Sequence, residues 1–584
     1  MNVSGARENA GRGMFFALEN VVGSDEDKKG RVAMNRSQIV CPRKTIWLAM
    51  MVALFPVSAS ALDAPISTDA PATLEPVASA VEAEPASEEP TESEPVAPVV
   101  QDEPPVSDLQ EILAPLLEDP LVQRANVAVH VVNASTGEVV FDHRGSEPLV
   151  PASTMKAVTA ASALRTLGPA YRFETKILKT GDITGAGVLN GDLYVKGGGD
   201  PTMVIEKLWK LVQDIRLNGI REVNGRVVFD DSDFETHAGV PGWNKPEDIE
   251  RGPSYYPALG GLSLNFNTVA LVVGPGANVG DPARVELETP TDVVTIDNAA
   301  VTGSTGASRW VRLSRSVEAS DVTFKVEGRV PATSKTRRYY RTVPDPTAYF
   351  VGAFAAMCES HGIRVRKGFQ RGITPAGAST FLTVQSQPLG KILLDMNKFS
   401  NNFIAEQVLQ AMGTTSPEQK GTTTEGLKVV DAYLASIGVS GGEDALVNGS
   451  GLSRHSKIRA STLTSVLVDM YSDPQVGAEF RSSLAIGGLD GTLRKRFDEG
   501  DEVNRLRGKT GSLNGVHCLT AYVEAADGEM YAFAFLVNDL SGPLSRAKKL
   551  QDRFASALFS VGTPEQIDGS SEVLIPASNA GEVD

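Results

Sequence analysis

The chain has 584 residues, a formal net charge of −17 and a composition with 41% hydrophobic and 22% charged residues. Its length suggests roughly three or four domain-sized pieces rather than one small core. The acidity is concentrated at the ends, because residues 62–107 hold eleven acids and residues 561–584 hold five, with no base in either. Residues 1–61 carry eight bases and five acids, so residues 108–560 carry only −4. No basic stripe remains, which argues against a nucleic-acid partner.

The first 61 residues are predicted to be an N-terminal extension that ends in a signal peptide. Arg43 and Lys44 precede an apolar run over 46–57, and Ser58–Ala61 supplies an Ala-x-Ala cleavage site. We expect cleavage after Ala61 and a periplasmic mature protein, with an uncleaved membrane anchor as the alternative. Residues 62–107, rich in Pro, Ala and Glu, are predicted to form a disordered acidic linker.

Ordered structure is expected from Asp108, with an amphipathic helix, a β-hairpin over 127–142 and a helix from Ser153 to about Leu167. Short strands with Gly, Asp and Asn turns then predict one or two β-rich domains over 173–341. Further helices are predicted at 346–360, 389–412, 426–437, 460–471 and 544–559, and strands at 516–524 and 530–537. Strands at both ends and helices between them favour an α+β fold, with one antiparallel sheet packed between helices.

Ser153 and Lys156 form a Ser-x-x-Lys pair at the start of a predicted helix. Positions i and i+3 share a helical face, so the lysine can supply the base that a serine nucleophile needs. Its pKa must then fall, through burial and a cation such as Lys509. Lys156 is the only charge in 149–163, whereas the second such pair, Ser545 with Lys548, lies in a basic helix. A capped helix with a surface lysine is the alternative for either pair.

Two further motifs follow in the chain. Ser400-Asn401-Asn402 ends an apolar helical stretch. Its serine can relay a proton to a leaving amine and Asn402 can hold Lys156 and substrate, although helix capping is the alternative. Lys509-Thr510-Gly511 precedes a predicted strand. There Lys509 can pair with a substrate carboxylate, Thr510 can line a cleft, and Gly511 can let substrate approach the backbone.

Other candidates are predicted to be structural. Lys179–Gly181 repeats Lys-Thr-Gly within a turn, and Ser263–Asn265 repeats Ser-x-Asn within the β-rich region. Cys358 and Cys518 are expected to be buried free thiols. The six histidines show no metal spacing, so neither a metal nor another cofactor is expected.

The three motifs, in this order, are the signature set of penicillin-binding proteins and serine β-lactamases. The long insertion after the first motif narrows the resemblance, together with Asn448–His455, Asp490–Thr492 and Lys509–Leu513 followed by Gly515. These features resemble the D-alanyl-D-alanine carboxypeptidase/endopeptidase family, which includes low-molecular-mass class C enzymes similar to penicillin-binding protein 4.

The resemblance covers about residues 108–560 and implies an α+β transpeptidase fold, an antiparallel sheet with helices on both faces. It places the first part of the transpeptidase-like domain at 108–172, the inserted β-rich region at 173–341 and the second part at 342–560. An acidic tail over 561–584 follows.

The resemblance also implies a serine-type D-alanyl-D-alanine carboxypeptidase and D,D-endopeptidase that acts on peptidoglycan stem peptides. Ser153 would be the nucleophile, Lys156 the base, Ser400 the proton relay and Asn402 a positioning amide. Lys509 would bind the terminal carboxylate. The N–H groups of Ser153 and Ser512 would form an oxyanion hole. β-Lactam antibiotics would acylate the same serine as covalent inhibitors, and a homodimer is one expected assembly.

Four further residues are implied as contacts to substrate: Asp230 and Phe234, which resemble a stretch that touches the diaminopimelyl stem, with Arg454 and Asn514. Two departures leave substrate preference open. Asn401 stands where aspartate is common in the family, and Asn514 stands where a glutamine is found.

Two alternative functions are a serine β-lactamase and a non-catalytic peptidoglycan-binding protein on the same fold. The chain has no Glu-x-x-Leu-Asn stretch, and the 247 residues from Ser153 to Ser400 are too many for a compact β-lactamase. The presence of every reactive residue argues against the non-catalytic protein.

Overall fold

The computed structural model describes residues 108–414, 419–439, 443–498 and 502–561. The predicted signal peptide, the linker and residues 562–584 of the predicted tail lie outside this range. Among the residues described, none of the helices combines the length and the hydrophobicity needed to cross a lipid bilayer.

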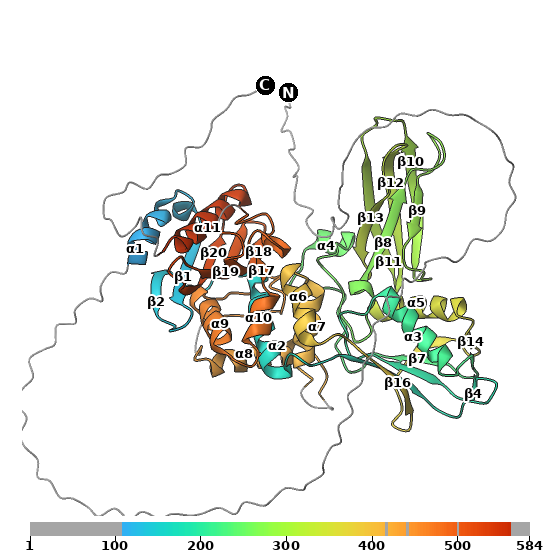
Figure 1. The fold of residues 1–584 in the computed structure, drawn as a ribbon. Coiled ribbons are helices and arrows are strands. Elements are labelled where there is room, and N and C mark those ends of the chain that lie inside the picture. The colour runs from blue at the N-terminus through green and yellow to red at the C-terminus, as the bar shows by residue number, and fades with distance from the viewer. Residues whose placement is uncertain (1–107, 415–418, 440–442, 499–501, 562–584) are drawn as a thin grey trace, which may run out of the picture. The chain divides into compact units, whose positions relative to one another are not determined.

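A six-stranded antiparallel sheet lies at the centre of the region that carries the three motifs, with the strand order β17-β18-β19-β20-β1-β2 (Figure 1). The strands are β1 (Asn126–Asn133), β2 (Val139–His143), β17 (Ala485–Ile486), β18 (Leu506–Leu513), β19 (Val516–Glu524) and β20 (Met530–Asn538). β1 pairs with β20 from Asn126 opposite Asn538 to Asn133 opposite Tyr531. The two ends of the described chain therefore close one sheet, as predicted.

Helices cover both faces of this sheet. Alternate residues of a strand point to opposite faces, and β1 buries Val127, Val129 and Val131 on one side. These residues share a core with α1 (Asp108–Leu113) and α11 (Leu544–Phe559). Ala128 and Val132 face a second core that contains α2 (Met155–Leu167) and α9 (Ala460–Ser472). The predicted arrangement of helices on both faces is confirmed.

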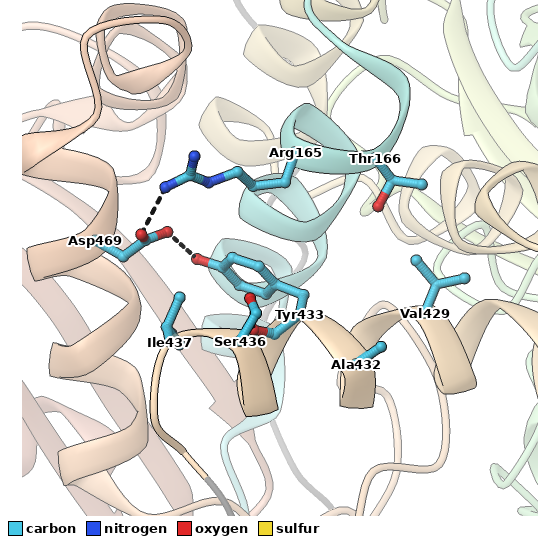
Figure 2. Close-up of a pocket in the computed structure, with 8 residues that line it drawn as sticks. All are labelled: Arg165, Thr166, Val429, Ala432, Tyr433, Ser436, Ile437 and Asp469. Carbon is cyan, nitrogen blue, oxygen red and sulfur yellow. Dashed lines mark hydrogen bonds and ion pairs between the residues drawn. The ribbon is translucent and has the colours of Figure 1, made fainter. Parts of the chain in front are cut away.

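The C-terminal end of α2 is joined to neighbouring helices by polar contacts. Arg165 donates to Asp469 of α9 over 2.6 Å, and the hydroxyl of Tyr433 in α8 (Thr423–Ser436) donates to the same carboxylate over 2.8 Å (Figure 2). These bonds hold the exposed end of a helix whose other end is buried.

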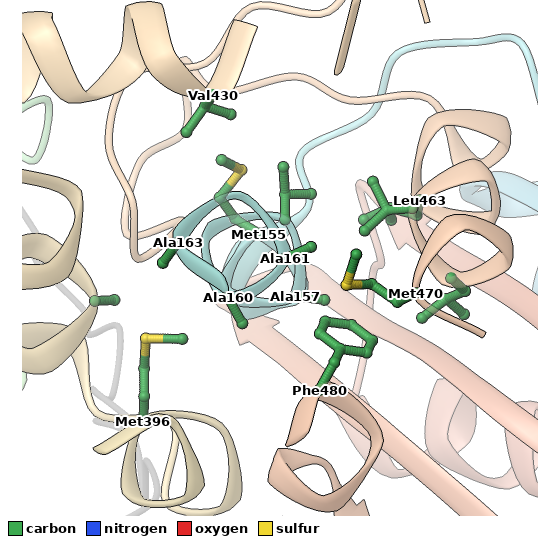
Figure 3. Packing of buried hydrophobic residues seen from close by; sticks show 14 of the residues in the cluster. Met155, Ala157, Ala160, Ala161, Ala163, Met396, Val430, Leu463, Met470 and Phe480 are labelled. Atoms are coloured by element: carbon green, nitrogen blue, oxygen red, sulfur yellow. The ribbon is translucent and has the colours of Figure 1, made fainter. Parts of the chain in front are cut away.

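The first ten residues of α2, from Met155 to Leu164, are all buried. Figure 3 shows its alanines facing large side chains of the surrounding helices. The helices that complete this core are α6 (Leu389–Lys398), α7 (Asn402–Met412), α8, α9 and α10 (Gly477–Ser483). Small side chains allow the helices to approach closely, and as a result Lys156, in the first turn of α2, is drawn into the interior.

The chain between α2 and α6 forms an inserted region with four sheets. The largest has the order β15-β7-β5-β3-β16, with β3 (Glu174–Lys179), β5 (Leu193–Lys196), β7 (Val227–Asp230), β15 (Phe369–Arg371) and β16 (Ser379–Gln385). Three sheets have three strands each: β14-β6-β4 (Arg364–Val365, Glu222–Val223, Val188–Leu189), β13-β8-β9 (Arg337–Thr342, Thr268–Gly274, Arg284–Leu287) and β10-β12-β11 (Val294–Gly303, Asp321–Pro331, Trp310–Glu318). The helices of this region are α3 (Ile205–Leu217), α4 (Pro246–Arg251) and α5 (Pro346–Ser360).

Short 3-10 helices occur at η1 (Ala114–Glu118), η2 (Val122–Arg124), η3 (Ala152–Thr154), η4 (Asn265–Asn267) and η5 (Gly491–Leu493). The helix predicted to begin at Ser153 begins at Met155, because η3 precedes it.

The strand pairing places the end of the inserted region later in the chain than the predicted boundary at residue 341. Residues 342–385 were expected in the second part of the transpeptidase-like domain, yet β15 pairs with β7 and β16 pairs with β3. The inserted region therefore extends to Gln385. Its end is set by hydrogen bonds between strands far apart in sequence, and no local pattern marks them.

The cysteines and the two repeated motifs that were predicted to be structural lie in structural settings. Cys358 in α5 and Cys518 in β19 are buried and free. The ammonium of Lys179 donates to the carbonyl of Gly181 across the predicted turn, and Ser263 donates to the carbonyl of Gly260.

Candidate active site

Ser153 lies in the η3 turn, immediately before α2. The preceding residue, Ala152, has a φ of 47°, a left-handed conformation that costs a non-glycine residue free energy and is often found at functional sites. Strand β18 lies directly against this turn. A Cβ atom on Gly511 would lie 2.6 Å from the Pro151 carbonyl oxygen and 3.0 Å from the Ser153 nitrogen. Glycine at this position therefore allows the third motif to reach the first.

Lys156 is fully buried, and its Nζ lies 3.0 Å from Ser153 Oγ. The Nζ also donates to Asn402 Oδ1 and to the carbonyl oxygen of Ser450, each over 2.7 Å. Burial lowers the pKa of Lys156 to about 7, against the opposing effect of the Glu406 carboxylate. A neutral amine that donates to two acceptors keeps its lone pair for the hydroxyl of Ser153, so Lys156 can serve as a general base.

Ser400 and Lys509 form a second pair. The Nζ of Lys509 donates to Ser400 Oγ over 3.0 Å and to the carbonyl oxygen of Thr510 over 2.8 Å. Lys509 is fully buried, and its pKa is held well below the usual value by burial and by the nearby Lys156. Ser400 has a φ of 55° in the link between α6 and α7. A substrate carboxylate beside Lys509 would favour the charged ammonium.

The two asparagines of the second motif have different tasks. Asn401 is the N-cap of α7, and its Oδ1 accepts from the Ile404 N–H over 3.1 Å. The capping alternative therefore applies to Asn401, a task that aspartate performs equally well. Asn402 bonds Lys156 through Oδ1 and donates through Nδ2 to the carbonyl oxygen of Tyr255 over 2.7 Å. Tyr255 belongs to the inserted region, and the sequence offered no signal for this contact.

The third motif lies inside β18, whereas the sequence predicted that it precedes a strand. Thr510 Oγ1 lies 2.8 Å from Thr492 Oγ1, and Ser512 Oγ lies 2.8 Å from the Nδ1 atom of His517. The strand could not be recognised because the two glycines in Gly508–Gly511 weaken its β-propensity, and pairing with β19 supplies the strand instead.

Glu406 is a functional candidate that sequence reasoning missed. It is fully buried, and its carboxylate accepts from the backbone N–H groups of Gly449 and Ser450 over 3.1 and 2.8 Å. The carbonyl of Ser450 in turn accepts from Lys156. Burial raises the pKa of Glu406, which the two backbone bonds and Lys156 oppose. A usable signal existed, because Glu406 lies four residues after Asn402 on the same helical face within an apolar run.

Two implied substrate contacts, Asp230 and Phe234, are buried. Asp230 is 1% exposed, and its carboxylate accepts from Ser232 and from the Thr374 N–H. Phe234 is 4% exposed and packs against Gly199. Their side chains have structural partners and little exposed surface, and the substrate contact that the resemblance implies for them stays a prediction.

Arg454 and Asn514 are brought together. The guanidinium of Arg454 donates to the carbonyl oxygen of Asn514 over 2.6 Å, and both residues are exposed. Asn514 follows β18 in the turn to β19, two residues after Ser512. These two residues therefore lie at the end of the strand that carries the third motif.

A separate pocket of about 460 Å³ opens at the other end of α2 and is lined by Arg165, Tyr433 and Asp469 among others (Figure 2). Arg165 lies about 13 Å further along the helix than Lys156. This pocket contains none of the motif residues.

Comparison with known proteins gives a family for this arrangement. The model of the D-Ala-D-Ala carboxypeptidase 3 (S13) family matches residues 109–558. The chain belongs to this family. It is 31% identical over 490 residues to a D-alanyl-D-alanine carboxypeptidase of Actinomadura sp. (strain R39), a match that covers 82% of this chain and 89% of the relative. It is 27% identical over 442 residues to the D-alanyl-D-alanine carboxypeptidase DacB of Haemophilus influenzae, covering 74% and 91%.

The crystal structure of penicillin binding protein 4 (dacB) from H. influenzae is similar, with a TM-score of 0.66 and 25% identity over 78% of this chain and 100% of that one. The same protein complexed with a β-lactam has a TM-score of 0.62, with 25% identity over 78% and 99%. The predicted D-alanyl-D-alanine carboxypeptidase/endopeptidase family and the predicted fold class are confirmed, and the protein is a serine-type D-alanyl-D-alanine carboxypeptidase.

Proposed function

We propose that this S13 enzyme removes the terminal D-alanine from peptidoglycan stem peptides through a covalent acyl-enzyme on Ser153. The observation that carries the proposal is the 3.0 Å approach of Lys156 Nζ to Ser153 Oγ, by a buried amine whose pKa is about 7. A base of that pKa is unprotonated in about half of the molecules at neutral pH, as general-base catalysis requires.

Acylation begins when Lys156 takes the hydroxyl proton and Ser153 Oγ attacks the carbonyl carbon of the penultimate D-alanine. The N–H groups of Ser153 and Ser512 are proposed to stabilise the negative charge that develops on the carbonyl oxygen. The carbon–nitrogen bond then breaks, and the amine of the terminal D-alanine receives a proton from the Ser400 hydroxyl, which Lys156 replenishes. Lys509 holds the carboxylate of the departing residue.

In deacylation, Lys156 and Ser153 act again, now with a water molecule as the nucleophile. Lys156, again neutral, removes a proton from a water molecule, which attacks the ester carbon. Ser153 leaves with that proton, and the shortened peptide is released. A β-lactam would enter at the first step, since its strained amide presents a carbonyl carbon and a carboxylate in the same relation. The H. influenzae relative has been solved in complex with a β-lactam, which supports this extension.

Labelling with fluorescent penicillin tests the proposal. Wild-type protein should label and Ser153→Ala should not. Ser545→Ala is the matched control because Ser545 has the same spacing to Lys548, and it should label like wild type. Equal labelling of wild type and Ser153→Ala contradicts the acyl-enzyme. Rapid turnover of the label, without release of D-alanine from a pentapeptide, would instead favour a β-lactamase, and no reaction with either would favour a non-catalytic binding protein.

We also propose D,D-endopeptidase activity on cross-linked stem peptides. In a cross-link to diaminopimelate the leaving amine is attached to a carbon that also carries a carboxylate, as in the terminal D-alanine, so Lys509 can serve both reactions. Release of monomers from a purified cross-linked dimer measures this activity, and an intact dimer under conditions that release D-alanine contradicts it. The periplasmic location and the homodimer remain predictions, to be tested by cell fractionation and by light scattering.

A further inference from the structure

Ser512 is joined to a buried histidine across the sheet. Ser512 of β18 and His517 of β19 stand opposite one another in the strand register, and Ser512 Oγ lies 2.8 Å from His517 Nδ1. Ser512 is exposed at the end of the strand that carries Lys509, whereas His517 is only 8% exposed. One side of the serine hydroxyl therefore contacts the protein interior while the other side faces solvent.

Two cations act on the imidazole of His517. Burial first, and then the charges of Arg496 and Lys548, lower the pKa of His517 to about 3, so the ring is neutral at physiological pH. Arg496 is 3% exposed, and its Nε donates to Asp552 over 2.7 Å. Asp552 and Gln551 both belong to α11, and Gln551 donates to the carbonyl oxygen of His517 over 3.3 Å. Helix α11 thus supports both the arginine and the histidine.

The hydrogen-bond partners of the two ring nitrogens select one tautomer of His517. A neutral imidazole has one N–H and one lone pair, and the two tautomers exchange their places. Within the described part of the chain, neither Nε2 of His517 nor Nη1 of Arg496 has a hydrogen-bond partner. An N–H on Nε2 would be a buried donor without an acceptor, which is costlier than a lone pair left unused there, whereas Nδ1 has the Ser512 hydroxyl oxygen 2.8 Å away. The proton therefore lies on Nδ1, which donates to Ser512 Oγ.

This tautomer determines what Ser512 can do for a ligand. Because the hydroxyl oxygen accepts from His517, its own proton is not needed by the histidine and can point to the exposed side. We propose that His517 is a positioning residue that makes Ser512 a hydrogen-bond donor to the carboxylate of the substrate. The inference rests on the proposed function, because it assigns this carboxylate to the cleft that Ser153 serves. A carboxylate has about four lone-pair sites, so Lys509, Thr510 and Ser512 can share it.

The asparagine and aspartate variants of His517 form a matched pair. The amide nitrogen of His517→Asn falls close to the position of Nδ1 and can donate to Ser512 Oγ. The carboxylate of His517→Asp has the same shape but can only accept, so Ser512 would turn its proton inward. The probes are benzylpenicillin, which has a free carboxylate, and its methyl ester, which has none. Acylation rate constants are measured by intact-protein mass.

We expect His517→Asn to acylate with benzylpenicillin within about threefold of wild type. His517→Asp should be slower by about 10- to 100-fold, the range for one hydrogen bond to a charged group. With the methyl ester the two variants should agree within about threefold. In a Ser512→Ala background the difference between Asn and Asp should disappear, because His517 acts only through Ser512.

Three results would overturn the inference. The first is equal acylation rate constants for His517→Asn and His517→Asp with benzylpenicillin, and the second is a rate difference between them that is just as large with the methyl ester. The third is a rate difference between them that persists in the Ser512→Ala background. Melting temperatures establish that each variant is folded. If His517→Asp does not fold, Ser512→Ala alone must slow acylation by benzylpenicillin and spare the ester. Wild-type protein that neither probe acylates refutes the proposed function, whereas wild-type acylation without these differences refutes only the role of His517.

Discussion

Acylation of Ser153 is predicted to slow as the pH falls below about 7, because Lys156 must be unprotonated to act as a base. With a pKa of about 7, the free amine is present in about 90% of molecules at pH 8, about 10% at pH 6 and about 1% at pH 5. The acylation rate constant should therefore fall about tenfold per pH unit between pH 7 and 5 and level off above pH 8.

Glu406→Gln perturbs this profile in a direction that the structure determines. The carboxylate of Glu406 raises the pKa of Lys156, so removing its charge should lower that pKa and move the acidic limb to lower pH. The amide keeps the shape but offers only one oxygen to the two N–H groups of Gly449 and Ser450. Loss of one such bond should also lower the plateau, by about 10-fold for a bond worth 1 to 2 kcal/mol.

The assay is the rate of labelling by fluorescent penicillin from pH 5 to 9 at constant ionic strength. Glu359→Gln is the control, because Glu359 is exposed at the end of α5 and should leave both limb and plateau unchanged. A rate constant that is flat from pH 5 to 9 contradicts the role of Lys156. An acidic limb that Glu406→Gln moves to higher pH contradicts the electrostatic reasoning.

Three further predictions concern other positions. Gly511→Ala should slow labelling of Ser153 at least about tenfold and lower the melting temperature, since its Cβ would lie 2.6 Å from a backbone oxygen; normal labelling would contradict the close approach. Cys358 and Cys518, whose pKa values burial raises to about 12, should resist a thiol reagent at pH 8 until the protein is unfolded, and rapid reaction of the native protein would count against their burial. Asp230→Asn should destabilise the fold by about 1–3 kcal/mol in denaturant unfolding and leave KM within about twofold, whereas a large rise in KM with unchanged stability would support a role as a substrate contact.

Most of the catalytic arrangement was accessible from local sequence. Ser153 and Lys156 lie three residues apart at a helix start, so helical geometry alone brings them together. The helix over Leu544–Phe559 and the helix over Pro346–Ser360 follow directly from their apolar periodicity. These inferences succeeded because they depend on residues less than about four positions apart or on one amphipathic element.

Other features depended on contacts between distant segments. The inserted region extends to Gln385 because β16 pairs with β3, roughly 200 residues earlier. Asp230 and Phe234 match a family motif, yet their burial follows from neighbours that the motif does not contain. The environment of Glu406 depends on the backbone N–H groups of Gly449 and Ser450, which lie 43 and 44 residues later in the chain.

The sequence by itself determined which residues could carry the reaction, because the order and local setting of three motifs depend on spacing and residue type. Only the tertiary structure decided what those residues are in chemical terms. Lys156 has a pKa of about 7 because five other helices enclose α2 and remove the lysine from water. The role proposed for His517 depends on the pairing of β18 with β19, which sets Ser512 beside its ring, and on the packing that buries the ring. Burial and electrostatic environment arise from packing across the whole chain, and no short motif contains them.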